Sequence, residues 1–165
     1  MPTRDAHCSY CGAALAIDQP WPRTCANCGE TTYRNPVPVA VAVLPVGDGV
    51  LVIRRAIPPR VGLLALPGGF VDHGESWQRA VVRELAEETG IVAAEADVSL
   101  FDVHSAPDGT VLIFGLLPAL PAADLPASTP NAEVAGWEIA RAADDMAFDL
   151  HARVLTRYLS DRITA

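Results

Sequence analysis

The feature that most constrains this chain is a segment near its middle that combines glycine, glutamate and apolar residues at fixed spacing. Residues 76–89 carry apolar side chains at helical intervals, and Gly90 stands where a helix C-terminal cap is expected. Three glutamates of this segment recur at i, i+3 and i+4: Glu84, Glu87 and Glu88. The spacing predicts that these carboxylates project from one side of a helix whose other side packs on a core.

A cluster of three carboxylates repels itself at neutral pH unless cations neutralise it. Hard oxygen ligands select Mg²⁺ or Mn²⁺ over zinc. The run Pro67-Gly68-Gly69 before the helix lets backbone approach such an ion, and Gly69 could offer its carbonyl oxygen as a ligand. The alternative is a solvated acidic helix face, which the flanking glycines argue against.

The full spacing resembles the Nudix box. Its fixed letters all occur: Gly69, Glu75, Arg83, Glu84, Leu85, Glu87, Glu88, Gly90 and Ile91. The resemblance implies an α+β fold, namely the α/β/α Nudix sandwich with a mixed β-sheet. It also implies hydrolysis of a phosphoanhydride bond.

The resemblance further implies roles for individual residues. The three helix glutamates would hold the catalytic divalent ions, and Arg83 would orient Glu84. Glu75 would support the cluster either by pairing with Arg83 or by binding metal. Two general bases stay open, Glu84 and the downstream Glu133, which matches in rough position an acid that many relatives use.

The rest of the chain predicts a mixed sheet and a second helix. Residues 37–46 and 50–55 have the β-branched composition of a strand pair joined by Gly47-Asp48-Gly49. Two more strands are expected at 97–104 and 110–117, and the proline-rich stretch 118–131 is expected to be a loop. An amphipathic helix is expected at 149–160.

The four cysteines of the chain all lie near its start, as two Cys-x2-Cys pairs: Cys8, Cys11, Cys25 and Cys28. This pattern suits a tetrahedral structural Zn²⁺ site with four thiolate ligands, and disulfides are the alternative. We therefore expect a zinc ribbon at 1–34 and a Nudix hydrolase domain at 35–165. The four histidines, His151 among them, are expected at the surface or partly buried.

The charge and hydropathy of the chain limit the kinds of partner that it is expected to bind. The net charge of −8 argues against a broad grip on nucleic acid or on an anionic membrane. Met1 to Tyr10 lacks a signal-peptide pattern and no apolar run is long enough to span a bilayer, so a cytoplasmic protein is expected. Arg54, Arg55 and Arg60 form a local basic group that either contacts substrate phosphates or faces solvent.

A zinc ribbon before a Nudix domain resembles NADH pyrophosphatases and a group acting on FAD or ADP-ribose. The Ser-Gln-Pro-Trp-Pro-Phe-Pro signature of the NADH enzymes is absent after the box, whereas Tyr33-Arg34-Asn35-Pro36 and Met146-Ala147-Phe148 echo the second group. The expected substrate is a nucleoside diphosphate linked to another moiety, such as ADP-ribose or FAD.

Other functions stay open. A Nudix domain can also act as a regulatory module that senses a nucleotide sugar without cutting it, although its box glutamates are then usually degenerate. Within enzymes, nucleoside triphosphate, NADH and capped-RNA pyrophosphatases are alternatives. Nudix relatives often form homodimers, so a homodimer is a further expectation that the sequence does not decide.

Overall fold

The computed structural model describes residues 5–163, and the chain divides into two compact units, Met1–Pro36 and Val37–Ala165. In the first unit, β1 (Arg23–Thr24) pairs antiparallel with β2 (Thr31–Thr32). Its small core consists of Cys8, Leu15 and Cys25. With so little apolar surface buried, a unit of this size needs a further source of stability.

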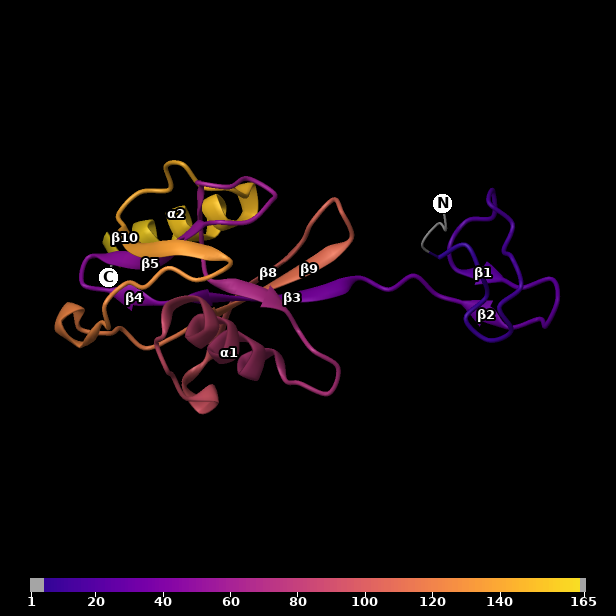
Figure 1. Ribbon diagram of the computed structural model, residues 1–165, viewed down its shortest axis with the longest axis horizontal. Helices are drawn as coiled ribbons and strands as arrows, with labels where there is room; N and C mark the ends of the chain where they lie inside the picture. Colours follow the sequence, from indigo (N-terminus) through magenta and orange to yellow (C-terminus); the bar gives the residue numbers. More distant parts are fainter. Residues whose placement is uncertain (1–4, 164–165) are drawn as a thin grey trace. The chain divides into compact units, whose positions relative to one another are not determined.

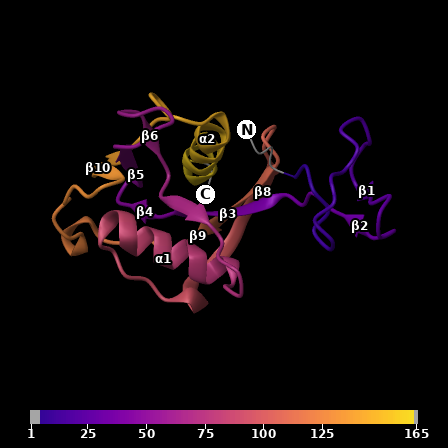
Figure 2. The same ribbon diagram turned by 45° about the vertical axis from the view of Figure 1, so that its right-hand side comes forward.

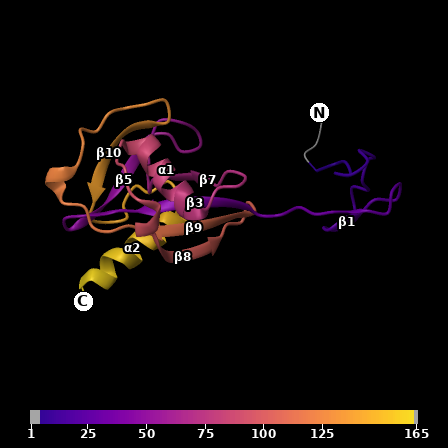
Figure 3. The same ribbon diagram turned by 90° about the horizontal axis from the view of Figure 1, so that it is seen from below.

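The second unit contains a mixed four-stranded sheet in the order β7-β3-β9-β8 (Figure 1). These strands span Val37–Val43 (β3), Gly68–Phe70 (β7), Ser99–Ser105 (β8) and Thr110–Leu116 (β9). The strands β3 and β9 are parallel, whereas β7 and β8 run antiparallel to their neighbours. Seen from below, β8 lies at the outer edge beside β9 (Figure 3).

A second sheet has the order β10-β5-β4, with β6 also paired to β5. Its strands span Pro45–Val46 (β4), Gly49–Arg55 (β5), Leu64–Ala65 (β6) and Val134–Ala140 (β10). Two α-helices, α1 (Trp77–Thr89) and α2 (Asp149–Ile163), lie on opposite sides of β3 and β9 (Figure 2). Two short 3₁₀ helices, η1 (Glu95–Asp97) and η2 (Ala122–Asp124), lie in connections.

The layers follow from the two-residue period of β3. Ala40 and Ala42 face the core that includes Val81 and Leu85 of α1. The alternate residues Val41 and Val43 belong to a second core, which includes Val154 and Leu155 of α2. Small residues under α1 let the helix approach the strand closely. The mixed sheet between two helices confirms the fold class expected from the sequence.

The expected pairing of 37–46 with 50–55 is correct only at its end. Pro45 and Val46 pair with Val50 and Gly49, but β3 pairs instead with β9 and β7 in the other sheet. The chain therefore changes sheets between β3 and β4. This happens because residues 40–43 are buried on both faces, a position that is filled only in the middle of a covered sheet.

Strand β10 was not expected from the sequence. Its register against β5 shifts between Val134 and Gly136, which breaks the regular alternation that marks a strand. Among residues 5–163, no helix combines the length and the apolar character that crossing a bilayer requires.

Candidate functional site

The helix α1 begins and ends with local capping interactions. The Ser76 hydroxyl accepts a hydrogen bond from the Arg79 N–H at 3.1 Å, and Gly90 adopts a left-handed conformation with φ 77°. Ala80, Val81 and Leu85 are buried against the sheet. These contacts fix the rotation of the helix, so its glutamates are presented along β7.

Strand β7 lies directly against two of these glutamates. The Gly68 N–H donates to Oε2 of Glu88 at 2.9 Å. A Cβ atom added at Gly69 would lie 2.3 Å from Oε1 of Glu84, closer than any van der Waals contact allows. A side chain at position 69 would therefore displace the Glu84 carboxylate from its place against the strand backbone.

Arg83 ties the acidic groups to one another. Its guanidinium donates to both carboxylate oxygens of Glu75 at 3.0 Å, to Glu84 at 2.7 Å and to Glu87 at 3.2 Å. It also donates to the carbonyl oxygen of Phe70 at 2.9 Å. The hydrogen bonds from Arg83 lower the pKa of Glu75. Of the two roles considered for Glu75, the structure contains the ion pair with Arg83.

Glu88 and Glu84 are held in a poorly solvated, negative environment. Burial raises the pKa of Glu88 to about 8, although the Gly68 N–H opposes the shift. Burial also raises the pKa of Glu84, and the charges of Glu87 and Glu133 add to this effect. Additional positive charge beside either carboxylate would favour its ionised form.

The same residues fit a hard divalent cation. Their side chains offer only oxygen ligands, and their mutual repulsion is the kind that a bound cation relieves. Within residues 5–163, however, the glutamate oxygens do not form a ready-made cluster, because Arg83 and Gly68 hold them separately. An ion at this place would share the carboxylates of Glu84 and Glu87 with Arg83, which contacts one oxygen of each.

Glu133 approaches the cluster from another part of the chain. Its charge raises the pKa of both Glu84 and Glu88. Asn131 positions it: the Asn131 amide donates to the carbonyl oxygen of Glu87 at 3.0 Å, while its Oδ1 accepts from the Glu133 N–H at 2.9 Å. Asn131 was not predicted as a functional residue, although asparagine side chains often bond backbone groups in turns.

A cavity of about 640 Å³ opens beside β7. Its walls come from Gly68–Phe70, the segment 55–60, the β8–β9 turn and the start of α2. Arg55 and Arg60 line this cavity, whereas Arg54 does not. Arg54 instead donates to Glu138 at 2.8 Å and to the Gly62 carbonyl oxygen at 2.7 Å. The three arginines predicted to form one basic group therefore have different surroundings.

The two arginines of the cavity also differ from each other. Arg55 donates to the Pro59 carbonyl oxygen at 2.9 Å, and its guanidinium lies 5.1 Å from the ring centre of Phe148. These contacts hold the 55–60 loop. Arg60 is exposed, and its side chain makes no hydrogen bond or ion pair to any residue in the described range 5–163. Arg60 is thus the cation of the rim with free donors.

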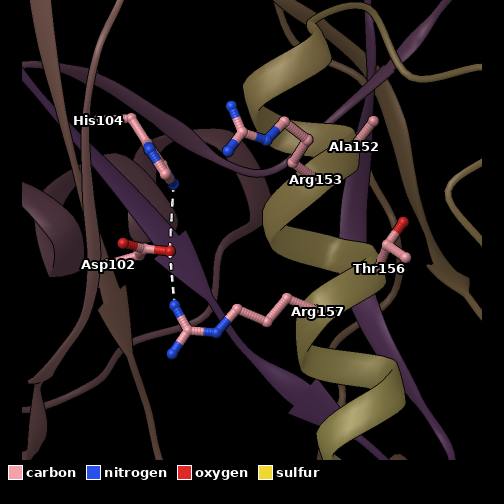
Figure 4. Close-up of a pocket in the computed structure, with 6 residues that line it drawn as sticks. All are labelled: Asp102, His104, Ala152, Arg153, Thr156 and Arg157. Carbon is pink, nitrogen blue, oxygen red and sulfur yellow. Dashed lines mark hydrogen bonds and ion pairs between the residues drawn. The ribbon is translucent and has the colours of Figure 1, made fainter.

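A second cavity, of about 540 Å³, lies between β8 and α2 (Figure 4). Asp102 occupies its centre, with Nε2 of His104 at 3.1 Å and Nη1 of Arg157 at 2.7 Å. Arg153 and Thr156 of α2 complete this wall. The acidic group here is already neutralised by its neighbours, and none of the residues expected to be functional lines this cavity.

The four cysteines of the first unit converge on one point. Among the described residues they are the one group of three or more His, Cys, Asp or Glu side chains whose ligand atoms lie within 4.8 Å of one another. The Sγ atoms of Cys8 and Cys28 are 3.7 Å apart, as are those of Cys11 and Cys25. Sulfurs placed about 2.3 Å from a central zinc in a tetrahedron are about 3.8 Å apart.

The four thiols share protons unequally. N–H groups of Cys11 and Tyr10 lower the pKa of the Cys8 thiol to about 6, whereas, against the backbone N–H of Glu30, burial and the three neighbouring cysteines raise the pKa of Cys28 to about 12. Gly12 and Gly29 donate to the carbonyl oxygens of Cys8 and Cys25 at 3.0 and 2.9 Å, which closes the two equivalent turns. The cluster could therefore hold a zinc ion.

Comparison with known proteins identifies the family. A model of the NUDIX domain matches residues 35–158. The chain is 41% identical over 76 residues to the ADP-ribose pyrophosphatase of Methanocaldococcus jannaschii, covering 46% of this chain and 44% of that protein. It is 33% identical over 85 residues to the NAD-capped RNA hydrolase NudC of Salmonella heidelberg, covering 51% of this chain and 33% of that protein. The matches thus span less than half the length of these relatives.

Solved structures agree on the fold. A NUDIX hydrolase from Nitrosomonas europaea superimposes with a TM-score of 0.71 at 24% identity, over 96% of this chain and 93% of that chain. The NUDIX domain of Shewanella oneidensis NrtR, complexed with ADP ribose, gives a TM-score of 0.65 at 25% identity over 79% of this chain and 90% of that chain. Because the family model covers most of the chain, this protein belongs to the NUDIX domain family.

Proposed function

We propose that this protein is a Mg²⁺-dependent hydrolase that cuts the diphosphate bond of a nucleoside diphosphate linked to a second moiety. ADP-ribose is the representative substrate. The observation that carries the proposal is the pair of desolvated carboxylates, Glu84 and Glu88, packed on the backbone of β7 at the edge of the cavity. Relatives named for ADP-ribose and NAD-capped RNA support a nucleotide-linked diphosphate.

The helix glutamates and Gly69 would hold the ion. When bound, Mg²⁺ neutralises charge on the diphosphate and lowers the pKa of water for in-line attack on phosphorus. Arg83 restrains Glu84 and Glu87, while the Gly68 N–H restrains Glu88. Glu75 acts through Arg83 and is a positioning residue.

Glu133 is the better of the two candidates for the base that takes the proton from water. Its carboxylate accepts no hydrogen bond from any residue of the described range, whereas Glu84 accepts one from Arg83 at 2.7 Å. A carboxylate that accepts no hydrogen bond from the protein can take the proton of an attacking water without first giving up a partner. Comparison of Glu133→Gln with Glu84→Gln in the pH profile of kcat separates the two candidates.

Arg60 supplies the positive charge at the rim of the cavity, with Arg55 behind it. Arg54 has no part in this proposal because Glu138 and Gly62 engage its donors outside the cavity. Arg60→Ala should raise KM for a diphosphate substrate, since a long-range attraction and up to two hydrogen bonds are lost. Arg54→Ala is the matched control and should leave KM unchanged.

The test of the function is product release from a panel: ADP-ribose, FAD, NADH, nucleoside triphosphates and capped RNA, each with Mg²⁺. Glu87→Gln/Glu88→Gln is the blank. Cleavage of a dinucleotide or nucleotide sugar to two monophosphates supports the proposal and names the substrate. Tight binding of these compounds without cleavage would instead favour a regulatory module that senses a nucleotide sugar.

We also assign residues 1–34 to a zinc ribbon in which Cys8, Cys11, Cys25 and Cys28 hold structural Zn²⁺. The sulfur spacing and the small core of this unit support the assignment. Metal analysis of the purified protein should give one zinc per chain, and Cys8→Ser/Cys11→Ser should abolish its binding.

A further inference from the structure

His151 occupies a position that its sequence context does not reveal. It lies in the first turn of α2, is 6% exposed and forms part of the wall of the 640 Å³ cavity. Its ring packs edge-on against Phe114 and tilted against Phe148, with centroids 5.7 and 5.2 Å away. The expectation of a surface or partly buried histidine is therefore wrong. A buried polar ring in a cavity wall calls for an account of both nitrogens.

The first nitrogen is engaged by the backbone. The Leu66 N–H donates to Nδ1 of His151 at 3.1 Å, so Nδ1 carries no proton and the neutral ring bears its hydrogen on Nε2. Burial, with a contribution from the charge of Arg55, lowers the pKa of His151 to about 3. The ring is consequently an uncharged donor over the whole physiological range of pH.

The second nitrogen has no hydrogen-bond partner among the described residues. No acceptor within residues 5–163 contacts Nε2 of His151. Among the described residues, the fully buried side-chain polar atom that lacks a hydrogen-bond partner is Nε1 of Trp137. Nε2 of His151 also lacks a partner but does not belong to that class, so it keeps some contact with solvent. Because the ring lines the cavity, Nε2 is accessible to whatever fills it. A ligand that offers no acceptor here would leave a desolvated N–H without a partner, which disfavours its binding.

The surroundings select the chemistry of that acceptor. Near His151 the wall is formed largely by apolar side chains such as Leu66, Leu112 and Phe148. The guanidinium of Arg55 is also near, but the Pro59 carbonyl oxygen and the Phe148 ring engage it, so the cation with free donors is Arg60. A phosphate is better placed at the glutamate-bound ion and Arg60 than beside a neutral donor among aromatic rings. A flat, uncharged group with ring acceptors suits the histidine wall.

We infer that Nε2–H of His151 donates a hydrogen bond to a ring acceptor of the substrate's nucleobase, which makes His151 a specificity-determining residue. The inference rests on the proposed function in one respect, namely that a nucleotide enters this cavity. It adds an orientation for the substrate, with the base at the α2 wall and the diphosphate at β7.

Two substitutions separate this role from a purely structural one. His151→Asn keeps an acceptor near the position of Nδ1 for the Leu66 N–H, but it is too short to replace Nε2–H. His151→Gln places an N–H near the position of Nε2 and loses the acceptor for Leu66. A structural histidine tolerates Asn better than Gln, whereas a base-binding histidine tolerates Gln better than Asn.

The experiment is calorimetric binding of AMP, with ribose 5-phosphate as the probe that lacks a base, to the full chain in Mg²⁺ buffer. His151→Asn should weaken AMP binding roughly tenfold, as expected for one lost hydrogen bond of about 1.4 kcal/mol, and His151→Gln should weaken it less. Neither change should alter binding of ribose 5-phosphate. Thermal melting of both variants checks that they fold.

The wild-type protein provides a measurement that does not depend on folding of the variants. AMP analogues in which carbon replaces N1, N3 or N7 remove one ring acceptor at a time. One of the three should bind roughly tenfold more weakly than AMP, the equivalent of one hydrogen bond. If all three analogues bind as tightly as AMP, the inference is overturned.

Two further results would also overturn it: a greater loss with Gln than with Asn, or an equal loss for ribose 5-phosphate. Steady-state kinetics with ADP-ribose distinguish this failure from that of the proposed function. Base-dependent AMP binding without any cleavage would reject the hydrolase and leave the inference standing. Cleavage of ADP-ribose with the same KM in wild type and His151→Asn would support the hydrolase and reject the inference about His151.

Discussion

At the scale of single residues, the site depends on two buried groups whose pKa values shift in opposite directions. Burial raises the pKa of Glu88 from 4.5 to about 8, and burial lowers that of His151 from 6.5 to about 3. The folded protein therefore binds a proton at Glu88 more tightly, and at His151 more weakly, than the unfolded chain does. Stability is therefore lost through Glu88 as pH rises from about 4.5 to 8, and through His151 as pH falls from about 6.5 to 3, so the two effects oppose each other between pH 4.5 and 6.5.

We predict that, without Mg²⁺, the Tm of the second unit is nearly constant between pH 4.5 and 6.5 and falls above and below this range. Glu88→Gln should remove the decline between pH 6.5 and 8, and His151→Asn should remove the decline below pH 4.5 and let Tm fall from about pH 4.5 upwards. Added Mg²⁺ should raise Tm more at pH 8 than at pH 6.5, because it stabilises the ionised carboxylates. A decline above pH 6.5 that persists unchanged in Glu88→Gln would contradict this account.

Substitution of the adjacent glycines Gly68 and Gly69 should affect different properties, stability for Gly68 and turnover for Gly69. A Cβ at position 69 meets the Glu84 carboxylate, whereas one at position 68 meets the backbone oxygen of Ala40 at 2.5 Å. Gly69→Ala should displace a metal ligand and lower kcat roughly 100-fold with Tm little changed. Gly68→Ala should instead cost about 1–3 kcal/mol of stability by overpacking. Turnover assays and thermal melts of the two variants test the contrast, and similar profiles would refute it.

At the scale of elements, the sequence predicted what is local. Periodic apolar residues and two caps were sufficient to place α1, and glutamates on one helix share a side by geometry alone. The parallel pairing of β3 with β9 was not predictable, because no turn or spacing marks two strands this far apart in the chain. Likewise Asn131 and His151 were missed because their partners, Glu87 and Leu66, lie 44 and 85 residues away.

The prediction at this scale concerns the connection that contains Asn131 and leads into β10. Asn131→Ala removes the bonds joining this segment to Glu87 and to the Glu133 N–H, so Glu133 should lose its fixed position. Kcat should fall, and Asn131→Ala/Glu133→Gln should be no worse than Glu133→Gln alone. Thr129→Ala is the control, since Thr129 bonds only its own segment, at Ala127. Additive losses in the double variant would show that Asn131 acts elsewhere.

At the scale of the whole molecule, the chain joins two units with different sources of stability. The second unit has two extensive apolar cores, whereas the core of the first consists of Leu15 and two of the four cysteines whose sulfurs converge. Folding of the first unit should therefore depend on metal. The second unit has the carboxylates, the cavity and the base-contacting wall within itself.

We predict that a chelator selective for zinc over Mg²⁺ unfolds the first unit and leaves the second folded. Circular dichroism should show loss of a small transition, while the main melting transition and cleavage of ADP-ribose stay unchanged. Restored zinc should recover the lost signal. Loss of cleavage along with the zinc would indicate that the ribbon contributes to the active site.

The central claim is that the glutamates of α1 hold the ion that cleaves a diphosphate. The most direct measurement is the rate of AMP and ribose 5-phosphate formation from ADP-ribose as Mg²⁺ is titrated, for wild type, Glu88→Gln and Glu138→Gln. Glu138 pairs with Arg54 outside the cavity and serves as the matched control. The account predicts Mg²⁺-dependent turnover in wild type and Glu138→Gln, and a loss of at least about 100-fold in Glu88→Gln. Equal turnover in all three proteins, or none in wild type with ADP-ribose bound, would contradict it.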